Sequence, residues 1–407
     1  MTDAAPGPAG PLVGVKVLEL GLLVAGPLAG SLMADLGADV VHVEAPGTGD
    51  PARAVGPSKD GIALWWKVGA RNKRSVTIDL GVPEGRDLAR RLVAWADVVI
   101  TNFRPTTLEK WELDFASLRA VNPTVIVLQV SAFGATGPKR DVGGFGKIGE
   151  ALSGAAHLTG WPEGPPAFSG FLLSDTTAAL MGVVAVEAAL YRRTQDPDFA
   201  GEWVDIALFE PLFRMIDWQV PAADQLGVPP VRAGNDSSIA ETSLLDTFAT
   251  GDNEWIVVSC GTARAVERAA DLVGGSDPLD RQDVKAAIAT WVSARSTGDA
   301  LAALEAAGVA ASRIYSAADI LADPVYAARG DIVTIDDPEL GPLRMPAVLP
   351  HLRAAPGRVW RAAPSIGQDN ELVLRTYLGL GDDEIDALAR AGATGRAEPP
   401  VPSAVTD

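Results

Sequence analysis

Asp175 is the residue whose type and position most directly suggest chemistry. It follows Phe171-Leu172-Leu173-Ser174 and precedes an apolar run, residues 176–190, that has one charged residue and no proline. Such a run predicts a buried helix, and Asp175 stands where the N-cap residue of that helix belongs. A carboxylate at this place accepts backbone N–H groups and faces the positive end of the helix dipole. We therefore expect Asp175 to be ionised at neutral pH.

Two interpretations of Asp175 follow from its position. Most aspartates that precede helices only cap them. An ionised carboxylate held against apolar surroundings is also the nucleophile that covalent acyl transfer requires. The glycine- and proline-rich stretch Gly160–Pro166, a few residues earlier, lets the backbone come close to a ligand. Position alone leaves both interpretations open.

The first predicted turn between a strand and a helix, Gly21–Gly30, is rich in glycine like a dinucleotide-binding loop. Glu44 ends the next predicted strand, where an acid that binds a ribose would stand. The spacing is not G-x-G-x-x-G, however, and Pro27 removes one N–H donor that a phosphate would use. A tight turn that packs the helix on the strand is the simpler interpretation, and a backbone contact to another nucleotide stays open.

Positive charges gather at two places in an otherwise acidic chain. Arg71-Asn72-Lys73-Arg74 starts one predicted strand, and Asn102-Phe103-Arg104 follows another, with Lys110 close behind. Ligands of parallel sheets bind outside the carboxyl ends of strands, so the second group is well placed. Phe103 offers a ring face to a purine, and arginine or lysine pairs with phosphates. A solvated charged surface is the alternative.

The composition describes a globular protein with an excess of acidic residues. Its 407 residues suggest two domains, and 47% of them are hydrophobic while 21% are charged. The 52 acidic and 34 basic residues give a net charge of −18, which argues against general nucleic-acid binding. The single cysteine, Cys260, fits a reducing cytoplasm. The three histidines lie far apart, so we predict no metal site.

Neither the N-terminal residues nor the longest apolar run suggests a membrane protein. Residues 1–11 lack the pattern of a signal peptide. The apolar run 176–190 is shorter than the roughly 20 residues that a membrane-spanning helix needs. We therefore expect a cytoplasmic protein that binds neither membranes nor nucleic acids.

Strands alternate with helices in the first half of the sequence. Apolar runs predict strands at residues 15–20, 39–44, 75–80, 97–101, 124–131 and 203–207, and helices at 27–36 and 83–95. This alternation predicts an α/β fold with a mostly parallel sheet that is covered on both faces.

The second half is divided by proline-rich stretches. Candidate linkers lie near 220–235 and 338–364, with a strand at 255–260 and alanine-rich helices between them and two helices, 370–377 and 383–391, after them. We predict a large domain from residues 1–220, a small domain from 235–335, and a return linker with the C-terminal part of the large domain from 336–394. Residues 395–407 are predicted to be a disordered tail.

Several short motifs occur in a fixed order between about Leu12 and Tyr191. They are Gly14-Val15-Lys16-Val17-Leu18-Glu19, Ala25-Gly26-Pro27, Leu36-Gly37-Ala38-Asp39-Val40, Asn72-Lys73-Arg74-Ser75, Ala96-Asp97-Val98-Val99-Ile100-Thr101-Asn102-Phe103, Asn122-Pro123, Thr159-Gly160, Gly164-Pro165-Pro166 and Ser174-Asp175, with a weaker match at Pro364-Ser365-Ile366-Gly367. Together they resemble the family III CoA-transferases. That group includes formyl-CoA:oxalate and carnitine CoA-transferases and the related 2-methylacyl-CoA racemases.

The resemblance implies a fold and a reaction. The fold is a Rossmann-like large domain built from both chain ends plus a smaller α+β domain, and two subunits form a homodimer of interlocked rings. Asp175 would attack an acyl-CoA thioester, form a mixed anhydride and release CoA thiolate. A later aspartyl-CoA thioester would pass CoA to a carboxylic acid acceptor. The CoA thioester is then a substrate, and no cofactor is bound permanently.

The resemblance also implies where CoA binds. The backbone around Val24 and Ala25 would contact it, and its adenine would lie near Asn102 and Phe103. The remaining expected contacts are the phosphate partners Arg104 and Lys110, the strand Ile78–Leu80, Arg74 and Phe145.

Three departures from the family pattern concern the substrate. Ala45 follows the strand-ending glutamate where some members have arginine, which removes one phosphate contact. Val24 stands where the oxalate-using enzymes have glutamine, and residues 234–238 replace their shielding run of glycines. Oxalate is therefore not the expected acceptor.

Two alternatives to a CoA-transferase remain. The racemases use a histidine together with the same aspartate, but Phe145 stands at the matching place and cannot exchange protons. The second alternative is a protein that binds CoA esters without turnover, in which Asp175 only caps a helix.

Overall fold

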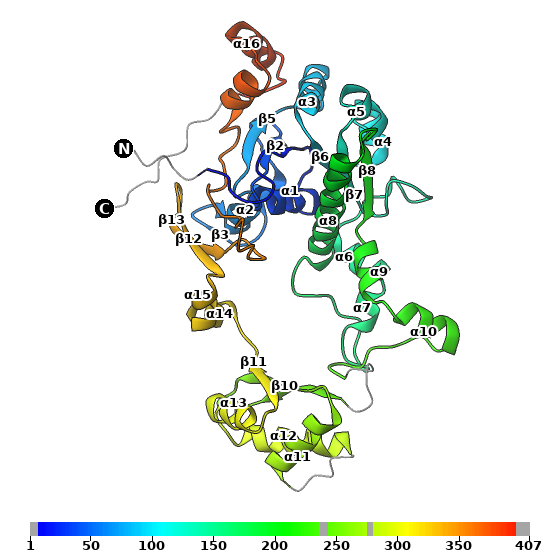
Figure 1. Cartoon of the computed structure of the whole chain (residues 1–407), viewed down its shortest axis with the longest axis vertical. Helices are drawn as coiled ribbons and strands as arrows, with labels where there is room; N and C mark the ends of the chain where they lie inside the picture. Colours follow the sequence, from blue (N-terminus) through cyan, green and yellow to red (C-terminus); the bar gives the residue numbers. More distant parts are fainter. Residues whose placement is uncertain (1–6, 237–242, 275–279, 396–407) are drawn as a thin grey trace. The chain divides into compact units, whose positions relative to one another are not determined.

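The computed structural model describes residues 7–236, 243–274 and 280–395 and forms two compact units (Figure 1). The first unit is built from Met1–Ala155, Ser169–Trp218 and Ala327–Asp407, and the second from Ala156–Phe168 and Gln219–Tyr326. Residues 156–168, which the sequence analysis assigned to the large domain, thus group with the second unit. The domain bounds stay a prediction, and residues 396–407 of the expected tail lie outside the described residues.

A six-stranded sheet forms the centre of the first unit, in the order β5-β2-β1-β6-β7-β8, and all neighbouring strands are parallel. Its strands are β1 (Lys16–Glu19), β2 (Asp39–Glu44), β5 (Arg74–Thr77), β6 (Val98–Thr101), β7 (Ile126–Ser131) and β8 (Glu202–Ala207). The predicted α/β class with a parallel sheet is confirmed. The strand order reverses between β1 and β6, the place where ligands of such sheets bind.

Both faces of the sheet are covered by helices, because alternate strand residues point to opposite sides. Val17, Ile100 and Leu128 face α1 (Ala25–Asp35) and α8 (Leu173–Gln195) in one apolar cluster. Leu18, Val99 and Val127 belong to the other, with residues of α3 (Pro83–Trp95), α4 (Pro105–Trp111) and α5 (Phe115–Val121). The first unit thus has three layers, with the sheet between two layers of helices (Figure 1).

The helix that carries Asp175 differs from its prediction. α8 begins at Leu173 with Leu172 as its N-cap, so Asp175 lies in the first turn and is not the N-cap. The added turn is anchored from outside the helix, because the Ser174 hydroxyl donates to the carbonyl of Leu208 at 2.6 Å. α8 also has the length and apolar character of a membrane span, and it is alone in this among the described helices. The expectation that this run is too short was therefore wrong, although 56% of its apolar window is buried inside the protein.

The C-terminal part of the first unit returns to the edge strand β5. Ser75 donates its N–H to Asp369 at 2.9 Å, and Thr77 donates its N–H to Asn370 at 2.7 Å. A π-helical turn (Leu372–Tyr377) and α16 (Asp382–Arg390) follow. The stretch 338–364 is not purely a linker, since β12 (Ile332–Asp337) pairs with β13 (Gly341–Pro346). Prolines are tolerated there because each strand of a two-stranded sheet has an unpaired edge.

Short elements complete the first unit around the carboxyl edge of the sheet. They are the 3-10 turn η1 (Pro51–Ala54), β3 (Ser58–Lys59), β4 (Ile62–Ala63), α2 (Leu64–Gly69), α6 (Gly146–Leu152), α7 (Ala155–Leu158), which continues into the second unit, and α9 (Glu210–Met215).

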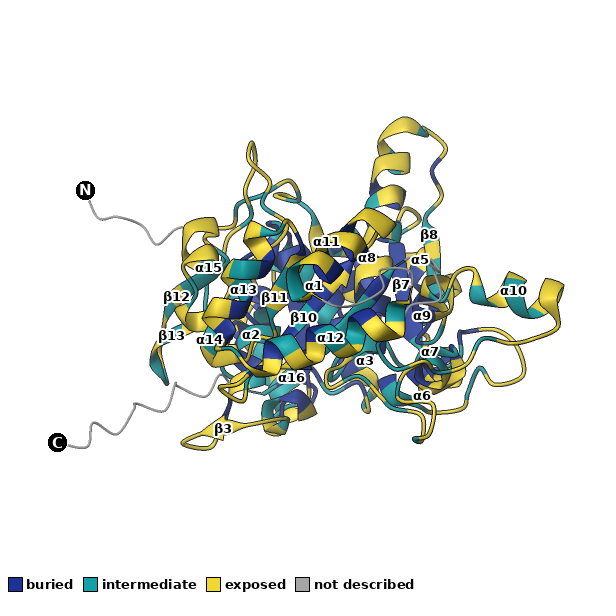
Figure 2. Ribbon diagram, turned by 90° about the horizontal axis from the view of Figure 1, so that it is seen from below, coloured by how far each residue is buried: buried dark blue, intermediate teal, exposed yellow. Residues whose placement is uncertain are grey.

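The second unit is built on an antiparallel sheet of three strands, β9 (Leu244–Ala249), β10 (Trp255–Cys260) and β11 (Ala310–Arg313), with β10 in the middle. Its helices are α10 (Gln219–Leu226), α11 (Ala263–Val273), α12 (Arg281–Ser293), α13 (Thr297–Ala306), α14 (Ala317–Ala322) and α15 (Pro324–Arg329). The buried residues of α12 are Val284, Ile288 and Val292, four positions apart on one face, and the other residues are half-buried or exposed (Figure 2). Cys260, the last residue of β10, is a buried free thiol.

Candidate active site

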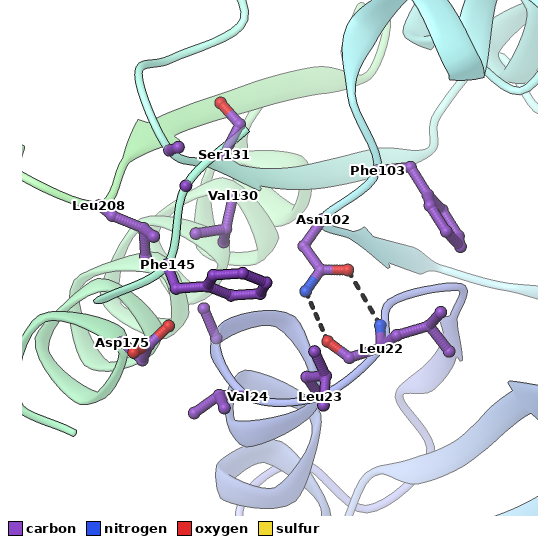
Figure 3. A pocket seen from close by; sticks show the side chains of 13 residues that line it. Leu22, Leu23, Val24, Asn102, Phe103, Val130, Ser131, Phe145, Asp175 and Leu208 are labelled. Carbon is purple, nitrogen blue, oxygen red and sulfur yellow. Dashed lines mark hydrogen bonds between the residues drawn. The ribbon is translucent and has the colours of Figure 1, made fainter. Parts of the chain in front are cut away.

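A cavity of about 220 Å³ lies at the carboxyl edge of the sheet, at the place where the strand order reverses (Figure 3). The segments that follow β1, β6, β7 and β8 line it, and the first turn of α8 closes one side. Its lining residues are Leu22, Leu23, Val24, Ala25, Asn102, Phe103, Val130, Ser131, Ala132, Gly144, Phe145, Asp175 and Leu208. The structure thus brings together six of the residues expected at the site, Val24, Ala25, Asn102, Phe103, Phe145 and Asp175.

The Asp175 carboxylate is packed tightly between helices. The residue is only 7% exposed. A Cβ added to Gly146 at the start of α6 would lie 2.0 Å from Oδ2 of Asp175, so any larger residue there would displace the carboxylate. Among the described residues, none other than Asp175 itself donates a hydrogen bond to this side chain. The carboxylate is therefore desolvated, and no other described residue forms a hydrogen bond with it.

Burial raises the pKa of the Asp175 carboxyl to about 6. The residue's own backbone N–H lowers the pKa, the nearby Glu150 carboxylate raises it, and the Lys147 ammonium lowers it. At pH 7 about nine in ten molecules still carry the carboxylate. The expected ionised state is kept, but the pKa is raised by desolvation, whereas the sequence analysis relied on capping and the helix dipole.

Lys147 and Glu150 on α6 hold the segment that leads into α8. Glu150 accepts hydrogen bonds from the N–H and hydroxyl of Ser169, both at 3.0 Å. Lys147 pairs with Glu150 at 2.6 Å and donates to the carbonyls of Ser169 and Phe171. Sequence reasoning missed both residues, and their i, i+3 spacing was the only available signal.

Asn102 ties the loops after β6 and β1 together. Its side-chain oxygen accepts from the N–H of Leu22 at 2.9 Å, and its amide nitrogen donates to the carbonyl of Leu22 at 2.6 Å (Figure 3). The oxygen and the nitrogen of the amide thus both help to hold the loop after β1 against the loop after β6.

A second cavity of about 710 Å³ continues from the first and shares Asn102, Phe103, Ser131, Ala132, Gly144 and Phe145 with it. It adds two cationic side chains, Arg104 and Arg140. Arg140 pairs with Glu109 and lies 3.3 Å from Asp141. The sequence analysis predicted Arg104 but missed Arg140, because the loop between β7 and α6 follows no periodic pattern.

Four residues expected at the site line neither of these cavities. Arg74 lies at the amino end of β5, the opposite edge of the sheet, where it pairs with Asp39 at 2.8 Å. Ile78 and Leu80 are 2% and 9% exposed in the apolar cluster beside the edge strand. Lys110 is exposed in the last turn of α4. Their expected contacts with CoA stay predictions, because these four residues do not line either cavity.

The cationic group 71–74 is neutralised inside the protein. Arg71 pairs with Asp35 at 2.6 Å, and Lys73 pairs with Glu19 at 2.9 Å, with little exposure on either side. These charges face buried carboxylates, so they are not offered to a phosphate. Glu44 is likewise paired inside the protein: it accepts hydrogen bonds from the Arg53 guanidinium and is not offered to a ribose.

The model of CoA-transferase family III matches residues 12–370. The chain belongs to this family. Succinyl-CoA--D-citramalate CoA-transferase from Chloroflexus aurantiacus is 38% identical to it over 395 residues, which is 94% of this chain and 97% of that protein. Succinate--glutarate CoA-transferase from Agrobacterium fabrum is 34% identical and spans 92% of this chain and 97% of its own length.

A solved structure supports the same assignment for this CoA-transferase. A CAIB/BAIF family protein from Brucella suis superimposes with a TM-score of 0.80 at 31% identity, covering 91% of this chain and 100% of that one. The resemblance and the enzyme class predicted from the sequence are confirmed. As a CoA-transferase, the protein acts on a CoA thioester and a carboxylic acid. These matches favour neither the racemase nor the non-catalytic alternative.

Proposed function

We propose that this enzyme transfers CoA through covalent intermediates on Asp175. The observation that carries the proposal is the buried carboxylate, with a pKa raised to about 6, in a cavity at the carboxyl edge of the sheet. A desolvated carboxylate that is still ionised at pH 7 is a competent nucleophile toward a thioester.

The transfer proceeds in four balanced steps. An oxygen of Asp175 attacks the thioester carbonyl, the C–S bond breaks, and CoA thiolate leaves with the electron pair. The thiolate attacks the Asp175 carbonyl of the mixed anhydride and expels the donor acid, which leaves an aspartyl-CoA thioester. The acceptor carboxylate then attacks this thioester, and a second anhydride forms as CoA thiolate leaves. Finally the thiolate attacks the acceptor's carbonyl, which forms the product thioester and frees Asp175.

We propose that CoA spans both cavities. The thioester lies beside Asp175 in the smaller one, against Val24 and Ala25. The nucleotide end lies in the larger one, where Arg104 and Arg140 are the cations available to its phosphates. Phe103 offers its ring to the adenine, and the same ring packs at 75° to the ring of Trp111, with the ring centroids 5.1 Å apart.

Succinyl-CoA is the donor to test first. Both relatives described above are named for succinyl-CoA or succinate. A low-molecular-weight dicarboxylic acid is the matching acceptor class, because donor and acceptor occupy the same site in turn.

An oxygen-label experiment tests the covalent route. With the acceptor acid labelled by ¹⁸O in its carboxylate, the bridging oxygen of the second anhydride stays on Asp175 after turnover. We therefore expect ¹⁸O in the peptide that contains Asp175, measured by mass spectrometry, and none in the Asp175→Asn variant. Turnover that leaves Asp175 unlabelled would show that the acceptor attacks the donor thioester directly.

We also propose a homodimer, in the interlocked-ring arrangement that the resemblance implies, and a cytoplasmic location. The outward face of α8 supports self-association: Leu180, Val184 and Tyr191 are 49%, 65% and 69% exposed. An apolar helix face of this kind is a typical subunit contact. Cys260 as a free buried thiol suits a reducing compartment.

A further inference from the structure

A cluster of ionised side chains is buried beneath the loop that follows β1. Three are acidic and three are basic: Glu19, Glu44, Asp50, His42, Arg53 and Lys73. All but Arg53 are at most 1% exposed. The steps proposed above make no use of them.

Ion pairs and hydrogen bonds link the members of this buried ionic cluster to one another. Glu19 lies 2.6 Å from Nδ1 of His42 and 2.9 Å from the Lys73 ammonium. Nε2 of His42 lies 3.3 Å from Asp50 on its other side. Asp50 in turn donates its backbone N–H to Glu44 at 2.9 Å.

His42 is the cation at the centre of the cluster. Burial by itself would lower its pKa, but the carboxylates of Glu19, Asp50 and Glu44 raise the pKa to about 9. The ring is therefore an imidazolium at neutral pH. Buried ion pairs add little net stability over apolar packing of the same volume, so stability alone is a weak reason for six such groups.

Two contacts lead from the cluster to the wall of the active-site cavity. The N–H of Leu23 donates to both oxygens of Asp50, at 3.1 and 3.2 Å. The Lys73 ammonium donates to the carbonyl of Pro27 at 2.6 Å. Asp50 and Lys73 thus fix the two ends of the segment that contains Val24 and Ala25.

Leu23 needs this support because its backbone is left-handed, with φ at +65°. That conformation costs a residue with a branched side chain about 1 kcal/mol or more, so a hydrogen bond from outside the loop must stabilise it. The conformation of Leu23 sets where Val24 and Ala25 lie. These residues open α1, whose first N–H groups have no acceptor within the helix, and both residues line the cavity of Asp175.

We propose that Asp50, oriented by His42, is a positioning residue for CoA transfer: it fixes Leu23 in its left-handed conformation and thereby sets the Val24–Ala25 wall against which Asp175 attacks the thioester. The proposal rests on the covalent role of Asp175 argued above. Misplacing one wall of such a site by about 1 Å costs on the order of 100-fold in rate.

Two replacements of Asp50 separate positioning from charge. Asparagine keeps an oxygen for the N–H of Leu23, and its amide can donate to Nε2 of a neutral His42, because Glu19 holds the proton on Nδ1. Alanine loses both contacts, and it also loses the hydrogen bond that Asp50 accepts from the N–H of Ala52 at 2.7 Å. With succinyl-CoA as the probe, we expect Asp50→Ala to lower kcat and the rate of Asp175 acylation at least about tenfold, and Asp50→Asn by less than about threefold. The KM for succinyl-CoA should change less than kcat, because the Arg104 side of the site is untouched.

Asp337 provides the matched control. It is 3% exposed, pairs with Lys67 at 3.0 Å and accepts two backbone N–H groups, but it does not contact the Leu23 loop. Asp337→Ala should lower the melting temperature about as much as Asp50→Ala while leaving kcat unchanged. If Asp50→Ala fails to fold, His42→Gln keeps the bond to Leu23 but removes its support, and we expect a smaller fall in kcat.

Three outcomes overturn the proposal: an Asp50→Ala enzyme with the wild-type rate, equal losses in Asp50→Ala and Asp50→Asn, or an equal loss in Asp337→Ala. The absence of an Asp175 adduct in the wild-type enzyme would contradict the covalent mechanism instead. Overall turnover of the same variants would then decide whether Asp50 positions the loop.

Discussion

At the scale of single residues, Asp175 meets two opposing demands. In the proposed mechanism its carboxylate must lose water to attack a thioester, and yet it must stay charged. The structure meets both by burying the side chain while leaving Glu150 and Lys147 of opposite sign close by. The result is a pKa of about 6, above that of an exposed aspartate and below neutral pH.

The pH dependence of the first chemical step follows from this pKa. Because the nucleophile is the ionised form, acylation of Asp175 should be constant above about pH 7 and fall tenfold per unit below about pH 6. Rapid-quench measurement of adduct formation at subsaturating succinyl-CoA checks this. A range from about pH 4.5 to about pH 8 extends at least one unit beyond the pKa on each side, so it covers both the constant and the falling part of the profile. A rate that stays constant down to about pH 5 would place the pKa near the usual aspartate value of about 4, and it would show that burial does not act on this group.

Gly146 gives a second prediction at this scale. An added Cβ would lie 2.0 Å from Oδ2 of Asp175, so Gly146→Ala must displace the carboxylate. We expect kcat to fall about 100-fold. Gly298→Ala, in a helix of the second unit with open space around the added carbon, is the matched control and should leave kcat unchanged. Equal activity of both variants would mean that the carboxylate can move without loss.

At the scale of elements, the site depends on how the strand ends are held. Asn102 makes two hydrogen bonds to Leu22 and so joins the loops on either side of the reversal point. Asn102→Ala should lower the free energy of unfolding by about 2 kcal/mol and raise the KM for succinyl-CoA. Denaturant titration and steady-state kinetics measure the two effects.

Asn122 supplies the control for that experiment. Its amide donates to the carbonyls of Val93 and Ala96 at 3.2 and 2.7 Å, away from the cavity. Asn122→Ala should show a similar loss of stability with an unchanged KM. A raised KM in both variants would mean that general destabilisation, and not the loop, limits binding.

The sequence predicts regular elements well where local patterns are strong. The strands 39–44 and 255–260 and the helix 83–95 have the predicted bounds, because a short apolar run or a proline at N1 marks them. β11 was missed, since an alanine-rich strand gets its stability from pairing with β10. The start of α8 was misplaced because Ser174 bonds to Leu208, which is far away in sequence.

The site shows the same division. The loops after β1 and β6 could be placed together because the carboxyl ends of parallel strands meet at one edge. The resemblance supplied Val24, Phe145 and the role of Asp175. Arg140, Glu150 and the Asp50–Leu23 contact could not be predicted, because each depends on how loops fold over the sheet. The ion pair of Arg74 with Asp39 could not be predicted either, since the two residues are neighbours only through the pairing of β5 with β2.

At the scale of the whole molecule, the exposed face of α8 bears on assembly. Val184 is 65% exposed in the middle of that face, so Val184→Asp should weaken the proposed dimer by burying a charge in the contact. Light scattering should give twice the 42.2 kDa of one chain for the wild type and a lower mass for the variant. Val121→Asp, at the end of α5, is the control and should remain dimeric. A monomeric wild-type protein would contradict the homodimer.

The most direct test of the account is the mass of the peptide that contains Asp175 after the enzyme is mixed with succinyl-CoA and quenched with borohydride or hydroxylamine. The account predicts a modification on Asp175, formed at a rate no slower than turnover and absent from Asp175→Asn. An enzyme that turns over succinyl-CoA while Asp175 stays unmodified would contradict it.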